Sequence, residues 1–190
     1  MKVLMLGNSF TYFHDLPQML AALFHEEVDS VTRGGAYLYQ MLDPQDELSA
    51  QVNAAISRES WDYIVLQEQS NAPVLKPDLF HPSVDQLCEI IRENGAKPVL
   101  YATWAYREGS PKLASTGMTY EEMDEEMYCS YHAAAERNHA LVADVGKAFT
   151  ALRGMIDPYE KTDDYHPSEA GSVLAAHVIA RTILDDWNKR

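Results

Sequence analysis

A serine that follows a short apolar stretch near the N-terminus is the first candidate for chemistry. Val3–Leu6 is followed by Gly7-Asn8-Ser9-Phe10-Thr11, and the glycine allows a sharp turn that presents the serine. A helix is expected a few residues later, and N–H groups near a helix N-terminus stabilise developing negative charge. Ser9 is therefore a candidate nucleophile, although most Gly-x-Ser sequences are turns or helix caps.

An aspartate and a histidine near the C-terminus have the spacing that could activate such a serine. In Asp163-Asp164-Tyr165-His166, Asp163 can bond one imidazole nitrogen of His166 while the other nitrogen faces a hydroxyl. Histidine is the side chain best suited to be a general base near neutral pH. The pattern Asp-x-x-His-Pro-Ser also occurs at 78–83, so His81 is a second candidate for the base. The alternative interpretation of His81 is a residue at the start of a helix. We favour His166 because it follows the last predicted strand.

Two further segments could donate hydrogen bonds to an oxyanion. Gly34-Gly35 follows a predicted strand, and these residues either present a backbone N–H or supply a loop with positive φ. The segment Gln67-Glu68-Gln69-Ser70-Asn71 follows another strand, and Gln67 and Gln69 share one face if the strand alternation continues. Either amide could serve as a donor, and a solvated loop is an equally good interpretation.

Apolar runs alternate with helical patterns, and this places all four segments at strand ends. The predicted strands are Val3–Leu6, Val28–Thr32, Tyr63–Leu66, Pro98–Thr103 and Ala140–Val142. Amphipathic stripes predict helices after Asp15 as a cap, after Asp43-Pro44, from Pro82 to Asn94, around Tyr120–Ala134 and around Val173–Trp187. The alternation predicts an α/β fold with a doubly wound, flavodoxin-like, five-stranded parallel sheet. Sites in such sheets lie at the carboxyl ends of the strands.

The composition restricts the kind of protein and its partners. The 190 residues, 46% hydrophobic and 23% charged, predict one globular domain over 1–190. A net charge of −14 without a basic cluster predicts no nucleic-acid partner and no membrane partner. The apolar stretch near the N-terminus is shorter than a secretory signal needs, so a cytoplasmic location is expected. The sequence does not define an oligomeric state.

The remaining chemical side chains give weaker indications. No histidine pair has His-x-x-x-His spacing and the two cysteines lack ligand spacing, so we expect no metal and no other cofactor. Cys88 falls on an apolar helical face, which predicts a buried thiol. Trp104 and Tyr106 follow the fourth predicted strand and either form the floor of a sugar pocket or pack at its rim.

Taken together, the four strand-end segments resemble the SGNH (GDSL-like) hydrolase family in type and order. Gly7-Asn8-Ser9 is similar to the family's first block, Gly-Asp-Ser, with Asn8 in place of the aspartate. Gly35 resembles the second-block glycine, with Gly34 as a rival, and Asp163-x-x-His166 matches the last block. The third block, Gly-x-Asn-Asp, is replaced by Gln-Glu-Gln-Ser, as in a divergent branch.

The resemblance implies a three-layer α/β sandwich and a serine esterase that forms an acyl-enzyme. It implies a catalytic triad of Ser9, His166 and Asp163. It also implies oxyanion donors, namely the N–H groups of Ser9 and Gly35 and an amide of Gln69 or Gln67, with Asn71 as a shifted alternative. Asn8 and Trp104 are candidates for substrate contact.

The implied substrates are small-molecule or carbohydrate esters, with acetyl esters favoured, because the glutamine-bearing variant looks closest to carbohydrate O-acetylesterases. Two other classes stay open at this stage. One is a non-catalytic glycan-binding module with a poor oxyanion hole. The other is a flavodoxin-like nucleotide or flavin binder that uses Ser9 and Thr11 around a phosphate, although the first loop lacks the Gly-x-Gly-x-x-Gly pattern.

Overall fold

Five parallel strands form one sheet in the order β2-β1-β3-β4-β5. The structure, a computed structural model, describes residues 1–189. The strands are β1 (Val3–Gly7), β2 (Val28–Thr32), β3 (Tyr63–Leu66), β4 (Lys97–Ala102) and β5 (Leu141–Asp144). All four neighbouring pairs are parallel. The predicted α/β class, strand number and doubly wound order are therefore confirmed.

β1 and β3 are buried along their whole length because helices cover both faces of the sheet. On β1, Leu4 and Leu6 contribute to one hydrophobic core, whereas Val3 and Met5 contribute to the other. Side chains alternate between the faces of a strand, so a strand with two cores reads as a continuous apolar run. For this reason the strand bounds predicted from the sequence lie close to the observed bounds.

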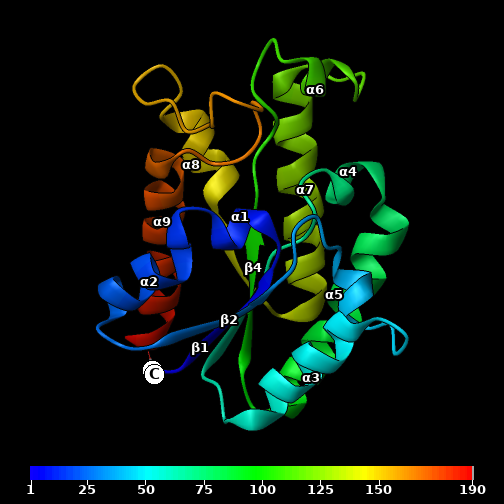
Figure 1. The fold of residues 1–190 in the computed structure, drawn as a ribbon, viewed down its shortest axis with the longest axis vertical. Helices are drawn as coiled ribbons and strands as arrows, with labels where there is room; N and C mark the ends of the chain where they lie inside the picture. Colours follow the sequence, from blue (N-terminus) through cyan, green and yellow to red (C-terminus); the bar gives the residue numbers. More distant parts are fainter. Residues whose placement is uncertain (190) are drawn as a thin grey trace.

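The helices lie in two layers, one on each face (Figure 1). One core contains residues of η2 (Leu38–Met41), α3 (Glu47–Arg58), α5 (Pro77–Glu93), α6 (Pro111–Ala114) and α7 (Tyr120–Asn138), with the short α4 (Ala72–Leu75) alongside. The opposite core contains residues of α1 (Ser9–Tyr12), α2 (Leu16–Phe24), α8 (Val145–Ala151) and α9 (Glu169–Trp187), and η1 (Phe13–Asp15) joins α1 to α2. Cys88 is fully buried in the first core, as predicted.

The helix start predicted after Asp15 is confirmed, although the cap is not, and the helix expected after Asp43-Pro44 begins later than predicted. Asp15 precedes α2 but has φ +57° and makes no side-chain cap, because the chain reaches α2 from the preceding short helices rather than from a strand. The helix expected after Asp43-Pro44 begins at Glu47, and the side chain of Asp46 accepts the N–H of Leu48 at 2.9 Å. A capping aspartate three residues further along therefore sets this start.

The helix expected to open at Pro82 begins earlier, at Pro77, so Pro82 lies inside α5. Proline is favoured at the first helical position, where its missing N–H costs nothing, and Pro77 occupies that position. Within the described residues, no helix combines the length and apolar character that a membrane crossing requires. The shift of α5 matters for function because it places His81 in the interior of a helix.

Candidate active site

Ser9 lies where β1 leaves the carboxyl edge of the sheet and α1 begins (Figure 1). The turn is closed by Asn8, whose side-chain oxygen accepts the N–H of Phe10 at 3.1 Å. Gly7 is required by close packing, because a Cβ at this position would lie 2.3 Å from Oγ1 of Thr11 and 2.7 Å from Oε1 of Gln67. As the first residue of α1, Ser9 keeps a backbone N–H that no carbonyl of its own helix accepts.

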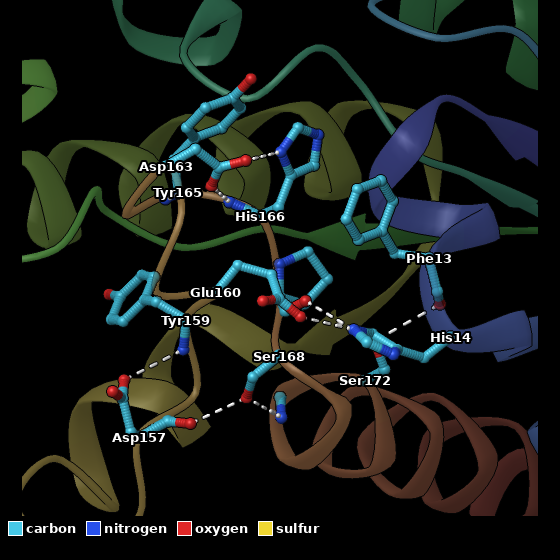
Figure 2. Close-up of polar contacts among 12 residues, drawn as sticks. Phe13, His14, Asp157, Tyr159, Glu160, Asp163, Tyr165, His166, Ser168 and Ser172 are labelled. Atoms are coloured by element: carbon cyan, nitrogen blue, oxygen red, sulfur yellow. Dashed lines mark hydrogen bonds and ion pairs between the residues drawn. The ribbon is translucent and has the colours of Figure 1, made fainter.

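Two short contacts connect Ser9, His166 and Asp163 in a chain. Ser9 Oγ lies 2.8 Å from Nε2 of His166, although 157 residues separate them. The other ring nitrogen, Nδ1, lies 2.6 Å from Oδ2 of Asp163, whose carboxylate points at the imidazole in Figure 2. The geometry is that of a serine hydroxyl, a base and an acid that orients the base.

The carboxylate of Asp163 is fixed by its own loop. Its second oxygen, Oδ1, accepts the backbone N–H groups of Tyr165 at 3.1 Å and His166 at 3.0 Å. Partial burial opposes ionisation, but the hydrogen bonds from the backbone and ring of His166 outweigh it, so the pKa of Asp163 lies below its ordinary value. Asp163 is therefore an anion at neutral pH and favours a proton on the facing imidazole nitrogen.

Residues that follow two other strands line the same cavity as Ser9. Gly35 is the third residue of a turn in which the N–H of Ala36 donates to the carbonyl of Arg33 at 3.0 Å. Its φ of +68° is the conformation that favours glycine there. Gly34, Gly35 and Gln69 line the same cavity as Ser9 and His166.

Comparisons with known proteins show the family to which the chain belongs. No protein-family model and no curated protein matches the sequence. A solved structure from Slackia heliotrinireducens, described as an SGNH hydrolase, is 43% identical, with 96% of this chain and 98% of that chain covered and a TM-score of 0.91. The chain belongs to the SGNH hydrolase family. This assignment makes it a hydrolase and confirms the resemblance inferred from the order of the four blocks.

Two more distant structures share the fold. A DUF4886 family protein from Bacteroides uniformis is 19% identical, with 96% of this chain and 82% of that chain covered and a TM-score of 0.71. An acetylxylan esterase from Geobacillus stearothermophilus is also 19% identical, with coverages of 96% and 93% and a TM-score of 0.66. At these identities the likeness extends to the fold alone.

The two glutamines of this SGNH hydrolase do not share a face, because β3 ends at Leu66 and strand alternation stops there. Oε1 of Gln67 accepts the N–H of Asn8 at 2.8 Å and the hydroxyl of Thr11 at 3.0 Å. Its Nε2 donates to the carbonyl of Glu68. The Gln67 amide therefore organises the serine loop and does not face the cavity, which corrects its expected role as an oxyanion donor.

Gln69 is placed differently. Its Nε2 donates to Oγ of Ser70 at 3.1 Å and its Oε1 accepts the N–H of Asn71 at 3.2 Å. These local bonds orient the amide, which has a second N–H, and Gln69 is a lining residue of the cavity. Gln69 therefore stays the candidate side-chain donor, whereas Asn71, the shifted alternative, is not among the lining residues.

Asn8 also lines the cavity, but the oxygen and the nitrogen of its side-chain amide both form hydrogen bonds within the protein. In addition to the cap on Phe10, its Nδ2 donates to the carbonyl of Ala36 at 2.9 Å. The side chain therefore connects the serine turn to the turn that carries Gly35.

The expectation that Trp104 forms a pocket floor is wrong. The indole is fully buried and stacks between Phe10 and Phe149, with centroid distances of 4.6 Å and 4.1 Å. Its Nε1 donates to the carbonyl of Tyr165 at 3.0 Å. Through this bond Trp104 supports the loop that carries His166, and its fully buried ring has no exposed surface for a ligand.

The structure separates the two candidate histidines. His81 lies on α5 against α7, where Nε2 is 3.4 Å from Oγ of Ser130 and Nδ1 is 3.3 Å from the guanidinium of Arg137. Burial and the Arg137 charge lower the pKa of His81. His166 is the histidine that contacts Ser9.

Sequence reasoning missed the contacts that fix the His166 loop. Nε2 of His14 lies 3.0 Å from a carboxylate oxygen of Glu160 and 3.2 Å from the carbonyl of Pro167 (Figure 2). The backbone N–H of Arg107 donates to the carbonyl of Asp164 at 3.1 Å, and its guanidinium donates to the carbonyl of Tyr159 at 3.2 Å. These pairs are far apart in the sequence, and no local pattern marks them.

The cavity has a volume of about 400 Å³. It is lined by Asn8, Ser9, Phe10, Tyr12, Phe13, Gly34, Gly35, Gln69, Ser70, Lys112, Tyr165 and His166. Among these described residues, Lys112 alone carries a permanent charge, and its Nζ lies 3.4 Å from the centroid of the Tyr165 ring. Within residues 1–189, no group of three or more His, Cys, Asp or Glu side chains is arranged to hold a metal ion.

Proposed function

We propose that this SGNH hydrolase is a serine esterase that cleaves carboxylic esters through a covalent acyl-enzyme. The observation that carries the proposal is the chain of contacts from Ser9 Oγ to His166 Nε2 at 2.8 Å and from His166 Nδ1 to Asp163 Oδ2 at 2.6 Å. A hydroxyl beside an imidazole that a carboxylate orients is the arrangement for nucleophilic attack on an acyl carbon.

In the acylation step, Ser9 Oγ bonds to the ester carbonyl carbon and its proton moves to Nε2 of His166. Asp163 stabilises the imidazolium through Nδ1. The tetrahedral intermediate then breaks its bond to the alkoxy oxygen, which takes the proton from Nε2 and leaves as the alcohol. In deacylation, water gives a proton to His166 as its oxygen attacks the acyl carbon, and the acid departs as Ser9 recovers its proton.

The oxyanion of each tetrahedral intermediate would bind three donors: the N–H of Ser9, the N–H of Gly35 and the amide of Gln69. All three residues line the cavity. Loss of one such donor typically removes about 2.7–4 kcal/mol of transition-state stabilisation. The role of the missing Gly-x-Asn-Asp asparagine is therefore assigned to Gln69.

Acetyl esters of carbohydrates are the proposed substrates. A neighbour with the same fold is described as an acetylxylan esterase, which supports this class by analogy. The cavity of about 400 Å³ falls in the range of small-ligand sites. Tyr12 and Tyr165 are among its lining residues, and sugars pack on aromatic side chains of this kind.

A panel of acyl esters tests the proposal, with p-nitrophenyl acetate, a longer acyl ester and acetylated xylo-oligosaccharides as substrates. Wild type should hydrolyse at least one, and Ser9→Ala and His166→Ala should reduce kcat by about 10³-fold or more. His81→Ala is the matched control and should retain wild-type activity. Hydrolysis by purified Ser9→Ala at the wild-type rate would overturn the mechanism.

A further inference from the structure

Glu68 is a buried carboxylic acid that the proposed mechanism does not use. Glu68 lies between Gln67 and Gln69 just after β3, and only 1% of its surface is exposed. Acidic residues are almost never buried to this extent unless hydrogen bonds or charges compensate. Its contacts therefore need a physical account.

One carboxylate oxygen of Glu68 accepts two backbone N–H groups from different segments. Oε1 lies 3.1 Å from the nitrogen of Leu38 and 2.6 Å from the nitrogen of Gln69. Leu38 begins η2, three residues after Gly35, and Gln69 follows Glu68 directly. The single oxygen thus joins the loop after β2 to the loop after β3.

Both joined segments carry proposed oxyanion donors. Gly35 and Gln69 line the cavity from these two loops, which lie beyond the ends of β2 and β3. Donors in an oxyanion hole must lie at hydrogen-bond distance from an oxygen that appears only in the transition state. A bond that sets the separation of these loops therefore sets the separation of the donors.

The charge state of Glu68 is sensitive to pH near neutrality. Burial raises its pKa from 4.5 to about 7, and the N–H groups of Gln69 and Leu38 and the charge of Lys76 oppose this rise only in part. Of the described residues, Lys76 and Tyr131 are the titratable groups that interact with it electrostatically. A carboxylate accepts N–H bonds more strongly than a neutral acid does, so protonation weakens both contacts.

We propose that Glu68 is a positioning residue whose ionised carboxylate aligns the Gly35 and Gln69 donors for the oxyanion. The inference rests on the proposed esterase function and goes beyond it, because it gives the site a second acidic requirement in addition to a neutral His166. Protonation of either group lowers the rate of the chemical step.

The test is the pH dependence of kcat and KM for Glu68→Gln, with Glu68→Asp and the surface variant Glu89→Gln as comparisons. In wild type, kcat/KM should fall as the pH is lowered through the pKa of Glu68 at about 7, because the neutral acid aligns the donors less well. Glu68→Gln lacks this step, so the ratio of wild-type to Glu68→Gln kcat/KM should fall from about tenfold at alkaline pH towards one in acid. The kcat of Glu68→Gln at alkaline pH should be about tenfold or more below wild type, with KM changed less than about threefold.

The companion variants separate positioning from simple loss of structure. Glu68→Asp keeps the charge on a shorter side chain, so it should keep a pH-dependent step that Glu68→Gln lacks, while its kcat falls. Glu89→Gln should match wild type. If Glu68→Gln does not fold, as judged by near-ultraviolet circular dichroism, Glu68→Asp decides, and a kcat equal to that of wild type overturns the proposal.

Ser9→Ala measured on the same ester distinguishes the two levels of inference. If Ser9→Ala is inactive while Glu68→Gln matches wild type in kcat and in its pH profile, the esterase function stands and the role of Glu68 is wrong. If Ser9→Ala is fully active, the esterase mechanism itself fails.

Discussion

The ring of Phe13 stacks on the imidazole of His166, with 4.2 Å between ring centroids and 4° between ring planes. Phe13 begins η1, directly after the short helix that Ser9 opens. The segment that carries the hydroxyl therefore also orients the ring that faces it. Phe10 adds an edge contact from the same segment, with its centroid 5.5 Å from that of His166.

Phe13→Ala should therefore lower kcat without removing any proposed catalytic group. The imidazole would lose its stacking partner, and a small displacement from Ser9 Oγ can reduce the rate by about 10- to 100-fold. Phe13→Tyr keeps the ring and should stay within about threefold of wild type. Steady-state kinetics on one acetyl ester measures both, and equal activity of the alanine variant and wild type would show that the stacking has no role.

Gln69→Leu should lower kcat by about 10²–10³-fold while it leaves KM and the thermal midpoint nearly unchanged, because its amide is assigned to the oxyanion. Gln67→Leu is the matched control. It leaves the buried N–H of Asn8 and hydroxyl of Thr11 without their acceptor, so it should lose about 1–3 kcal/mol of unfolding free energy per group. If only Gln67→Leu affected kcat at full stability, the two assignments would have to be exchanged.

Gly7→Ala should destabilise the fold by about 1–3 kcal/mol, the usual cost of forcing an extra methyl group into a packed site. The new Cβ would lie 2.3 Å from Oγ1 of Thr11 and 2.7 Å from Oε1 of Gln67. Gly34→Ala is the comparison, because its Cβ would meet the hydroxyl of the exposed Tyr12 side chain at 3.0 Å. Urea unfolding should place Gly34→Ala within about 0.5 kcal/mol of wild type, and equal losses in both variants would contradict the packing argument.

The pH dependence of stability should reveal the buried carboxyl of Glu68. With a pKa raised from 4.5 to about 7, the folded state binds more protons here than the unfolded state does between these values. The free energy of unfolding therefore falls as pH rises through this window, by about 3 kcal/mol from this group. Glu68→Gln lacks this effect. Its free energy of unfolding relative to that of wild type, measured by urea unfolding, should therefore rise by about 3 kcal/mol between about pH 4.5 and 8. A difference between the two proteins that stays constant with pH would contradict the raised pKa.

The sequence predicted the sheet and the general place of the site for the same physical reason. Strands with a core on each side are continuous apolar runs, so polar residues at their ends stand out, as Ser9 and Gln69 do. The Asp163-x-x-His166 spacing indicated the candidate base, because one loop can bring together two residues that are three positions apart. These features are local in the chain, and local features can be read without coordinates.

What the sequence did not predict depends on where the backbone turns after a strand. Gln67 and Gln69 are equivalent in sequence, but β3 ends before them, so the Gln67 amide organises the serine loop whereas Gln69 is a lining residue of the cavity. Trp104 similarly turns into the core between Phe10 and Phe149, contacts that come from distant segments. The bond from His14 to Glu160 joins residues 146 positions apart and has no sequence signature.

The central claim is that His166 and Asp163 activate the hydroxyl of Ser9, and intact-mass measurement after treatment with a fluorophosphonate tests it most directly. Wild type should gain a single adduct that peptide mapping assigns to Ser9. Ser9→Ala should gain none, and His166→Ala should react far more slowly, whereas His81→Ala should react like wild type. Failure of wild type to react, or an adduct on another residue that persists in Ser9→Ala, would contradict the account.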